Sequence, residues 1–206
     1  MIVRTLAAAG AAVLWSNVVL PRTGFGIRGR TIANAAFATG YCRIFDGRGE
    51  WCSTRGLQWG AGAFALTGTV YAAAAAIAPL RDRMAEVVPR APEVSTAEWV
   101  GVHIPLGTVY SEETIFRGTL DPLLARSLGP AGKWCGPVVF GLWHLRPARS
   151  AGDSVIGTVI ATTAGGVVFS WLRRRTGSVA APALAHLALN AGGALAPRLA
   201  RVLRDR

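Results

Sequence analysis

The segment "SVIGTVIATTAGGVVFSWL", Ser154–Leu172, contains no charged residue. A helix needs about 20 apolar residues to cross roughly 30 Å of bilayer hydrocarbon, because each residue advances the helix by about 1.5 Å. The stretch "LQWGAGAFALTGTVYAAAAAIAPL", Leu57–Leu80, is equally free of charge. These two segments predict transmembrane helices and therefore decide the fold class.

Further apolar segments extend this pattern over the chain. They are Ser178–Pro197, which contains a histidine, and the shorter stretches Thr5–Leu20, Thr31–Phe45, Trp99–Phe116 and Trp134–Leu145. We predict an all-α, polytopic transmembrane helical bundle with about seven membrane segments, or fewer if Thr31–Phe45 only lies on the membrane surface. The charged stretch Arg81–Glu98 is predicted to be the one substantial loop outside the membrane.

Composition points in the same direction. Charged residues make up 16% of the 206 residues, and hydrophobic residues make up 51%, whereas a soluble domain carries about 25% charged residues. The net charge is +11, but the basic residues, almost all arginine, are spread through the gaps between apolar segments. Nucleic-acid binders cluster such residues on one face, so we predict a lipid bilayer as the partner and no nucleic acid.

We predict a single integral-membrane domain over residues 1–206. It comprises N-terminal helices and a loop (1–98), helices that carry polar motifs (99–197) and a basic tail (198–206). The first apolar run follows an early arginine, as in a signal peptide, but no small-x-small cleavage site precedes Pro21, so an uncleaved helix is expected. An odd number of cysteines without a CxxC pair predicts no disulfide framework: Cys42, Cys52 and Cys135.

A few ionisable or polar residues interrupt the apolar segments. Each charged side chain at membrane depth costs on the order of 2.5 to 3.5 kcal/mol on insertion scales, which makes it a candidate functional residue by default. These residues are Glu112, Glu113 and Arg117 in "SEETIFRG", His144 in "FGLWHL", and His186 with Asn190 in "HLALN".

Their spacing predicts which side chains share a helix face. Glu113 and Arg117 are four residues apart, so they are expected to pair as opposite charges on one face. Glu112 lies about 100° further round the helix and remains free to point elsewhere.

The same interval of four residues recurs in two other segments. It separates His186 from Asn190, so both face one direction, and it separates Phe140 from His144, which places an aromatic ring one turn from an imidazole. His103 lies about 13 Å along a helix from Glu112 and is predicted to be outside the site. The tryptophans flank apolar runs and are predicted to be interface anchors.

A carboxylate, two imidazoles and an amide suit peptide hydrolysis. A carboxylate beside an imidazole can hold a water molecule and remove its proton, while a second imidazole and an amide N–H can stabilise the oxyanion. Alternatively, Glu112, His144 and His186 could bind a zinc ion with one open position. The sequence has no HExxH helix, so it does not support a zincin-type site. It identifies no cofactor with certainty, and zinc is the one that these residues could hold.

Three motifs carry a resemblance to a known family. "EETIFRG", "FGLWH" and "HLALN" resemble the motifs EExxxR, FxxxH and HxxxN of the CPBP family, the CAAX-protease and bacteriocin-processing (Abi) intramembrane proteases. The resemblance covers Trp99–Pro197. The three motifs occur there in the family's order, and each lies inside an apolar segment.

The resemblance implies roles for individual residues. Glu112 would activate water, and His144 would help to hold it, while His186 and Asn190 would form the oxyanion site. Glu113, Arg117 and Phe140 would support this geometry. Whether a metal is needed stays open.

The implied function is that of an intramembrane endopeptidase acting on a membrane protein or lipidated peptide. The arginine-rich, lysine-poor composition indicates a bacterium with a G+C-rich genome, and hence a multi-pass protein of the plasma membrane. Two alternatives remain: a catalytically idle relative that acts as a bacteriocin-immunity or scaffold protein, and a small proton-coupled transporter. Against the transporter, the sequence shows no duplicated half of the kind found in inverted-repeat transporters.

Overall fold

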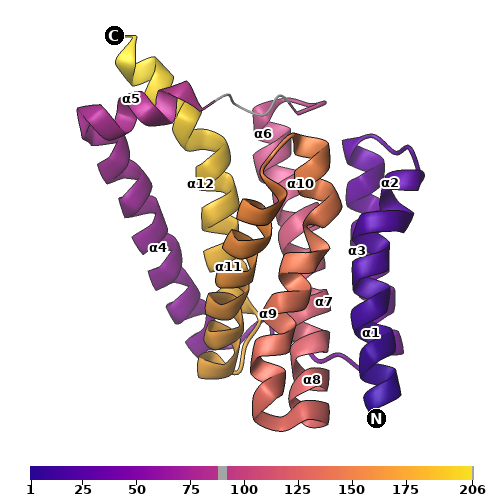
Figure 1. Cartoon of the computed structure of the whole chain (residues 1–206). Coiled ribbons are helices and arrows are strands. Elements are labelled where there is room, and N and C mark those ends of the chain that lie inside the picture. Colours follow the sequence, from indigo (N-terminus) through magenta and orange to yellow (C-terminus); the bar gives the residue numbers. More distant parts are fainter. Residues whose placement is uncertain (88–91, 206) are drawn as a thin grey trace.

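The computed structural model describes residues 1–87 and 92–205, and every regular element in this part of the chain is helical. The all-α prediction is therefore confirmed for the described residues. The helices form seven long segments, which run side by side in Figure 1. Their elements are α1 (Ile2–Leu14), η1 (Trp15–Val19), α2 (Leu20–Arg22), α3 (Ile27–Ile44), α4 (Thr54–Ala76), α5 (Ala78–Glu86), α6 (Thr96–Glu98), η2 (Trp99–Tyr110), α7 (Ser111–Ile115), η3 (Phe116–Leu120), α8 (Asp121–Leu128), η4 (Gly129–Ala131), α9 (Gly132–Trp143), α10 (Leu145–Ala151), α11 (Val155–Thr176) and α12 (Ala180–Arg204).

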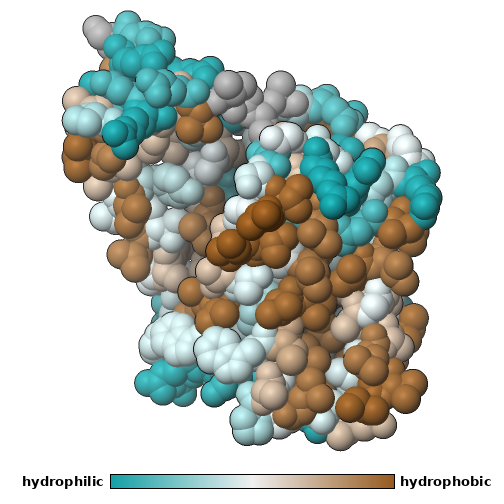
Figure 2. Space-filling view, in the orientation of Figure 1, coloured by the Kyte–Doolittle hydropathy of each residue, from teal (hydrophilic) through white to brown (hydrophobic). Residues whose placement is uncertain are grey.

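Two of the helical segments are long and apolar enough to cross a membrane. They are Ile2–Arg22 and Val155–Thr176, and a third is added if α4 and α5 form one span. In Figure 2 apolar atoms spread over the middle of the molecule, while hydrophilic atoms gather at its upper and lower ends. This distribution is what a bilayer requires of a protein that crosses it.

The predicted span Leu57–Leu80 is not one straight helix. It bends by 99° between α4 and α5, where Ile77 adopts an extended backbone. Pro79 accounts for the break, because proline has no N–H to continue the helix and pushes the preceding residues out of helical geometry. The α5 helix then turns toward the C-terminal part of α12 (Figure 1).

Parts of the predicted loop and tail are also helical. Residues 81–86 belong to α5 and residues 96–98 form α6, so the prediction of a loop was wrong at both ends. In the predicted basic tail, α12 continues to Arg204. Residues 88–91 of the loop and Arg206 of the tail lie outside the described residues.

Small residues let α4 and α12 pack closely. A Cβ atom added at Gly60 would lie 2.7 Å from the Leu184 side chain, and Gly192 faces the ring of Tyr71 at similarly short range. Small side chains are the usual means of helix association where lipid supplies no hydrophobic drive. This contact fixes α12, which carries His186, against the rest of the chain.

The centre of the bundle is the segment Ser111–Leu120, in which every residue is buried. It is in contact with α3, α9 and α11, and its residues Ile115, Phe116 and Leu120 belong to the main hydrophobic core. The two adjacent glutamates therefore lie in the interior, and not in a charged turn at the membrane surface.

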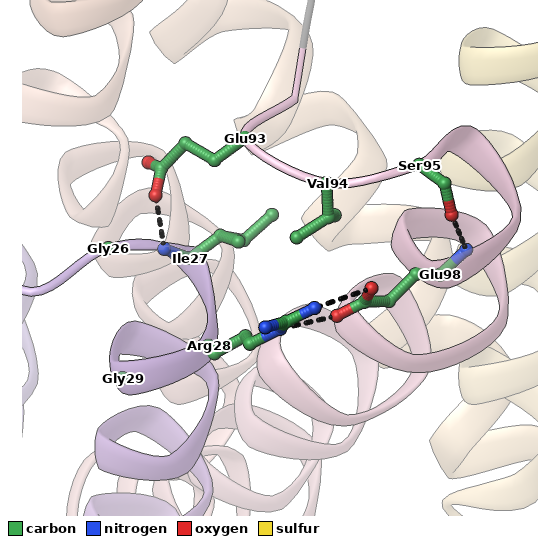
Figure 3. A pocket seen from close by; sticks show the side chains of 8 residues that line it. All are labelled: Gly26, Ile27, Arg28, Gly29, Glu93, Val94, Ser95 and Glu98. Atoms are coloured by element: carbon green, nitrogen blue, oxygen red, sulfur yellow. Dashed lines mark hydrogen bonds and ion pairs between the residues drawn. The ribbon is translucent and has the colours of Figure 1, made fainter.

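A second polar cluster ties α3 to the start of η2 (Figure 3). Arg28 donates two hydrogen bonds to Glu98, at 2.7 and 3.0 Å, and Glu93 accepts the backbone N–H of Ile27. Ser95 caps the helix by accepting the backbone N–H of Glu98. His103 contacts Thr31 at 2.8 Å and Glu98 at 3.2 Å, so His103 belongs to this cluster.

Candidate active site

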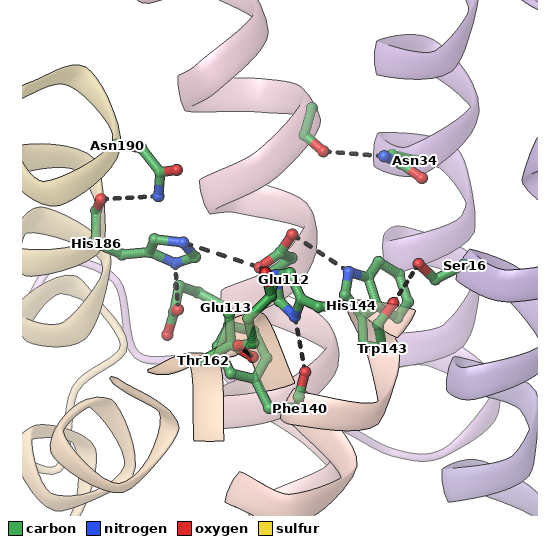
Figure 4. A network of polar contacts seen from close by, with 12 residues as sticks. Ser16, Asn34, Glu112, Glu113, Phe140, Trp143, His144, Thr162, His186 and Asn190 are labelled. Atoms are coloured by element: carbon green, nitrogen blue, oxygen red, sulfur yellow. Dashed lines mark hydrogen bonds and ion pairs between the residues drawn. The ribbon is translucent and has the colours of Figure 1, made fainter. Parts of the chain in front are cut away.

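Glu112 lies on α7, where its carboxylate faces two histidines from other helices (Figure 4). Its Oε1 accepts a hydrogen bond of 3.3 Å from the indole N–H of Trp143. Its Oε2 is buried without a hydrogen-bond partner among the described residues. This oxygen lies 3.8 Å from Nε2 of His144 and 3.8 Å from Nε2 of His186. A polar separation beyond 3.5 Å leaves room for a bridging water.

His144 occupies the C-terminal end of α9, where the helix stops. Its Nδ1 lies 2.8 Å from the carbonyl oxygen of Phe140. Because a carbonyl oxygen can only accept, this geometry assigns a proton to Nδ1. A neutral His144 therefore presents the lone pair of Nε2 toward Glu112.

His186 lies on α12, one turn before Asn190. Its Nδ1 is 2.8 Å from Oε1 of Glu113, and its ring stacks on Phe169 with the centroids 4.8 Å apart. The carboxylate and the aromatic ring fix both the position and the plane of the imidazole. Asn190 donates one hydrogen bond, of 3.2 Å, to the backbone carbonyl of His186, which leaves its second N–H for another acceptor.

Arg117 is completely buried in the same cluster. One guanidinium nitrogen lies 3.5 Å from Oε1 of Glu113, which is the ion pair that the spacing predicts. None of its nitrogens has a hydrogen-bond partner in the described part of the chain. The guanidinium instead lies 4.2, 5.1 and 5.7 Å from the ring centroids of Phe140, Phe169 and Phe116. Cation–π attraction in a desolvated site is worth about 2 kcal/mol.

A cleft of about 580 Å³ connects this cluster to the end of the molecule. Glu112, His144 and Asn190 line it at one end, while Trp99 and Arg198 line it at the other. The carboxylate of Glu112 therefore borders a cleft and is not enclosed on every side by packed side chains.

All the residues predicted for the site come together in space. Phe140 contacts the ring of His144 edge to face, at 4.9 Å between centroids. Two further side chains of the site, Phe169 and Trp143, were not predicted from the sequence. The prediction that Trp143 is an interface anchor was wrong, because this side chain is 3% exposed and donates a hydrogen bond to Glu112. The hydroxyl of Ser16 donates a hydrogen bond of 2.7 Å to the backbone carbonyl oxygen of Trp143.

The metal hypothesis can be compared with these distances. Glu112, His144 and His186 are donor types that zinc accepts, but tetrahedral ligands at about 2.0–2.1 Å from one zinc lie ~3.4 Å apart. The observed separations of 3.8 Å are wider. Over residues 1–87 and 92–205, no group of three or more His, Cys, Asp or Glu has the arrangement of a metal site.

Comparison with known proteins identifies a family. The model of the family described as "Type II CAAX prenyl endopeptidase Rce1-like" matches residues 94–192, which include Glu112, His144 and His186. No curated protein and no solved structure gave a match to the chain. The match agrees with the resemblance of the three motifs. Residues 94–192 of this chain therefore form a domain of the Rce1-like type II CAAX prenyl endopeptidase family, the CPBP family, whose members are embedded in membranes.

Proposed function

We propose that the chain is an intramembrane endopeptidase that hydrolyses a peptide bond of a membrane-associated substrate with water activated by Glu112 and His144. One observation carries the proposal: Oε2 of Glu112 is buried without a hydrogen-bond partner, midway between two imidazoles. An idle carboxylate would be expensive to keep in this state. The family supports peptidase activity.

A water molecule between Glu112 and His144 would be oriented for attack. It can donate one hydrogen to Oε2 of Glu112 and the other to Nε2 of His144, because both atoms are acceptors when His144 is neutral. Its lone pairs then point away from both side chains, toward the cleft. The hydrogen bond from Trp143 to Oε1 holds the carboxylate in this orientation.

His186 and Asn190 are suited to the opposite side of the reaction. In its doubly protonated form, His186 keeps its Nδ1–H on Glu113 and presents its Nε2–H on the side of Glu112. Its Nε2–H and the second N–H of Asn190 can donate to the substrate carbonyl oxygen. These donors stabilise the negative charge that develops on this oxygen in the transition state.

The proposed reaction proceeds in two steps. The water oxygen bonds to the carbonyl carbon while Glu112 takes one water proton, and the electron pair of the C=O bond moves to the oxygen. Glu112 then transfers this proton to the amide nitrogen as the C–N bond breaks and the C=O bond reforms. The products are a carboxylic acid and an amine, and Glu112 returns to its ionised state.

The same proposal places the substrate and the protein in the membrane. The buried carboxylate lies in an apolar bundle and borders a cleft of about 580 Å³, so a membrane protein or a lipidated peptide is the proposed substrate. We propose about seven membrane segments in one integral domain of a bacterial plasma membrane. The two or three helices that pass a test of length and apolarity support this arrangement.

The test is terminal-peptide mass spectrometry of membrane fractions. Cells carrying the wild-type chain are compared with cells carrying Glu112→Gln at equal abundance, and Glu86→Gln serves as a control because it makes the same chemical change at an exposed residue. We expect new peptide termini with wild type and Glu86→Gln that are missing with Glu112→Gln.

Identical termini in all three strains would contradict peptidase activity. If Glu112→Gln also complements a deletion of the gene, the chain acts as an immunity or scaffold protein. Loss of a proton-coupled uptake activity without a change in termini would favour a transporter.

A further inference from the structure

Two adjoining cavities lie at the end of the molecule opposite the opening of the cleft. The first, of about 210 Å³, lies between α8 and the end of α11 and is lined by Lys133, Arg173 and Arg174 together with Asp121. The second, of about 290 Å³, lies on the outer surface of α9 and α11, and its lining includes Trp134 and Trp171. Lys133 and Arg174 line both cavities, so the two form one continuous surface.

The first cavity is suited to an anion. Three cationic side chains face a single carboxylate, and Oδ2 of Asp121 already accepts a hydrogen bond of 2.6 Å from Ser170. Arg173 uses its Nε and one terminal nitrogen on the carbonyls of Arg117 and Arg48, which fixes its guanidinium at the cavity wall. Lys133 and Arg174 are exposed, and their charges are available to a ligand.

The second cavity is suited to a hydrocarbon chain. Trp134 is 57% exposed, Trp171 is 47% exposed, and Val168 between the helices is 52% exposed. These side chains lie on the outside of α11, one of the two helices that are long and apolar enough to cross a membrane. Exposed tryptophans beside basic residues mark the level where headgroups meet acyl chains. Figure 2 shows hydrophilic atoms at the lower left of the molecule, near the end of α11.

We propose that this surface binds an anionic phospholipid of the surrounding leaflet. The phosphate-bearing headgroup occupies the basic cavity, and one acyl chain lies in the apolar cavity between α9 and α11. Basic pockets between membrane helices bind acidic lipid headgroups in this way. A soluble anion would not occupy the apolar cavity. A protein partner would not require a basic cavity followed by an apolar cavity along the surface of a membrane helix.

The site is also connected to the candidate active site. Arg173 donates to the carbonyl oxygen of Arg117, and Arg117 forms the ion pair with Glu113. The bound lipid would therefore contact Arg173, the residue whose hydrogen bond holds the start of η3 in place. This connection does not depend on the proposed peptidase function.

Native mass spectrometry of the full chain in detergent tests the proposal. The added lipids are phosphatidylglycerol and phosphatidylcholine with the same acyl chains. We expect phosphatidylglycerol to bind the wild type at least tenfold more tightly than phosphatidylcholine. Lys133→Gln with Arg174→Gln should weaken phosphatidylglycerol binding about 30-fold, as expected for the loss of two charges at a membrane surface.

Two further comparisons separate this site from general surface charge. Arg43→Gln with Arg83→Gln removes the same number of exposed charges elsewhere and should leave binding within threefold of the wild type. Val168→Trp fills the apolar cavity without changing charge and should also weaken phosphatidylglycerol binding. Equal binding of both lipids, equal effects of the two charge variants, or full competition by inorganic phosphate would each overturn the proposal.

Discussion

Two groups of glutamate, histidine and arginine contact the same helical run, and they differ in how their charges are satisfied. At its start, Glu98 accepts hydrogen bonds from Arg28 and contacts His103. At its centre, the described residues give Glu113 one hydrogen bond, with His186, while its ion pair with Arg117 includes no hydrogen bond. In the first group the charged side chains are hydrogen-bonded to one another and connect two helices. The second keeps unsatisfied charge in the interior, which natural proteins tolerate mainly where charge is used.

The largest expected difference between the groups is in catalysis. His144→Gln should lower kcat about 100- to 10,000-fold, because the water loses the acceptor opposite Glu112. His103→Gln, in the satisfied group, should leave kcat of the folded protein unchanged. Cleavage of a substrate identified from the wild-type termini, measured in reconstituted vesicles, checks this. Equal effects of the two variants would remove the distinction between the groups.

The next difference is in stability. Glu113→Gln should lower the free energy of unfolding by about 3 to 5 kcal/mol, because it leaves the buried guanidinium of Arg117 without its ion-pair partner. Adding Arg117→Met should restore part of the loss, since the double variant removes the stranded charge as well. Unfolding in mixed micelles measures both. If the double variant is less stable than the single variant, the aromatic rings hold the arginine without need of Glu113.

A smaller effect is expected from the hydrogen bond between Trp143 and Glu112. Trp143→Phe keeps the aromatic packing against Phe116 but removes the indole N–H, and a hydrogen bond to a charged group is worth about 1.5–3 kcal/mol. We expect kcat to fall about 10- to 100-fold with little change in KM. Trp59→Phe, at a half-exposed tryptophan, is the matched control. An unchanged kcat would show that packing alone orients the carboxylate.

The smallest effect is expected at the exposed group. Hydrogen bonds from Arg28 and then His103 lower the pKa of Glu98 to about 2. A lowered pKa means that the contribution of Glu98 is complete above its ordinary value and is lost only as the pH falls through about 2. Arg28→Gln should therefore shift the melting temperature by less than about 3 °C, equally at pH 5 and pH 9. A large or pH-dependent shift in that range would contradict the satisfied, surface character of this group.

Helical spacing is sufficient to predict part of the site. It indicates the contact of Glu113 with Arg117 and the shared face of Phe140 and His144. Trp143 could have been found in the same way, because it lies three residues after Phe140 and next to His144. Phe169 carries no such signal, since one aromatic residue in an apolar helix has many equivalent positions.

The convergence of three helices does not follow from spacing. Periodicity says which side chains share a face, but not which faces meet. Glu112, His144 and His186 were grouped by their chemistry and by the resemblance to a family. The straight span Leu57–Leu80 was predicted from apolarity alone. Pro79 carried the signal for the 99° bend, but hydropathy does not register a backbone break.

The packing of α4 against α12 has a consequence for the order of events during synthesis. His186 follows Glu112 by about 75 residues, so a ribosome adding about 5–20 residues per second completes it ~4–15 s later. Until α12 has inserted and packed against α4, the carboxylate has no imidazole from that helix and Glu113 has no hydrogen-bond partner. Under the proposed mechanism, the nascent chain is inert while it shares the insertion machinery with other unfinished membrane proteins, and hydrolytic competence arrives with α12.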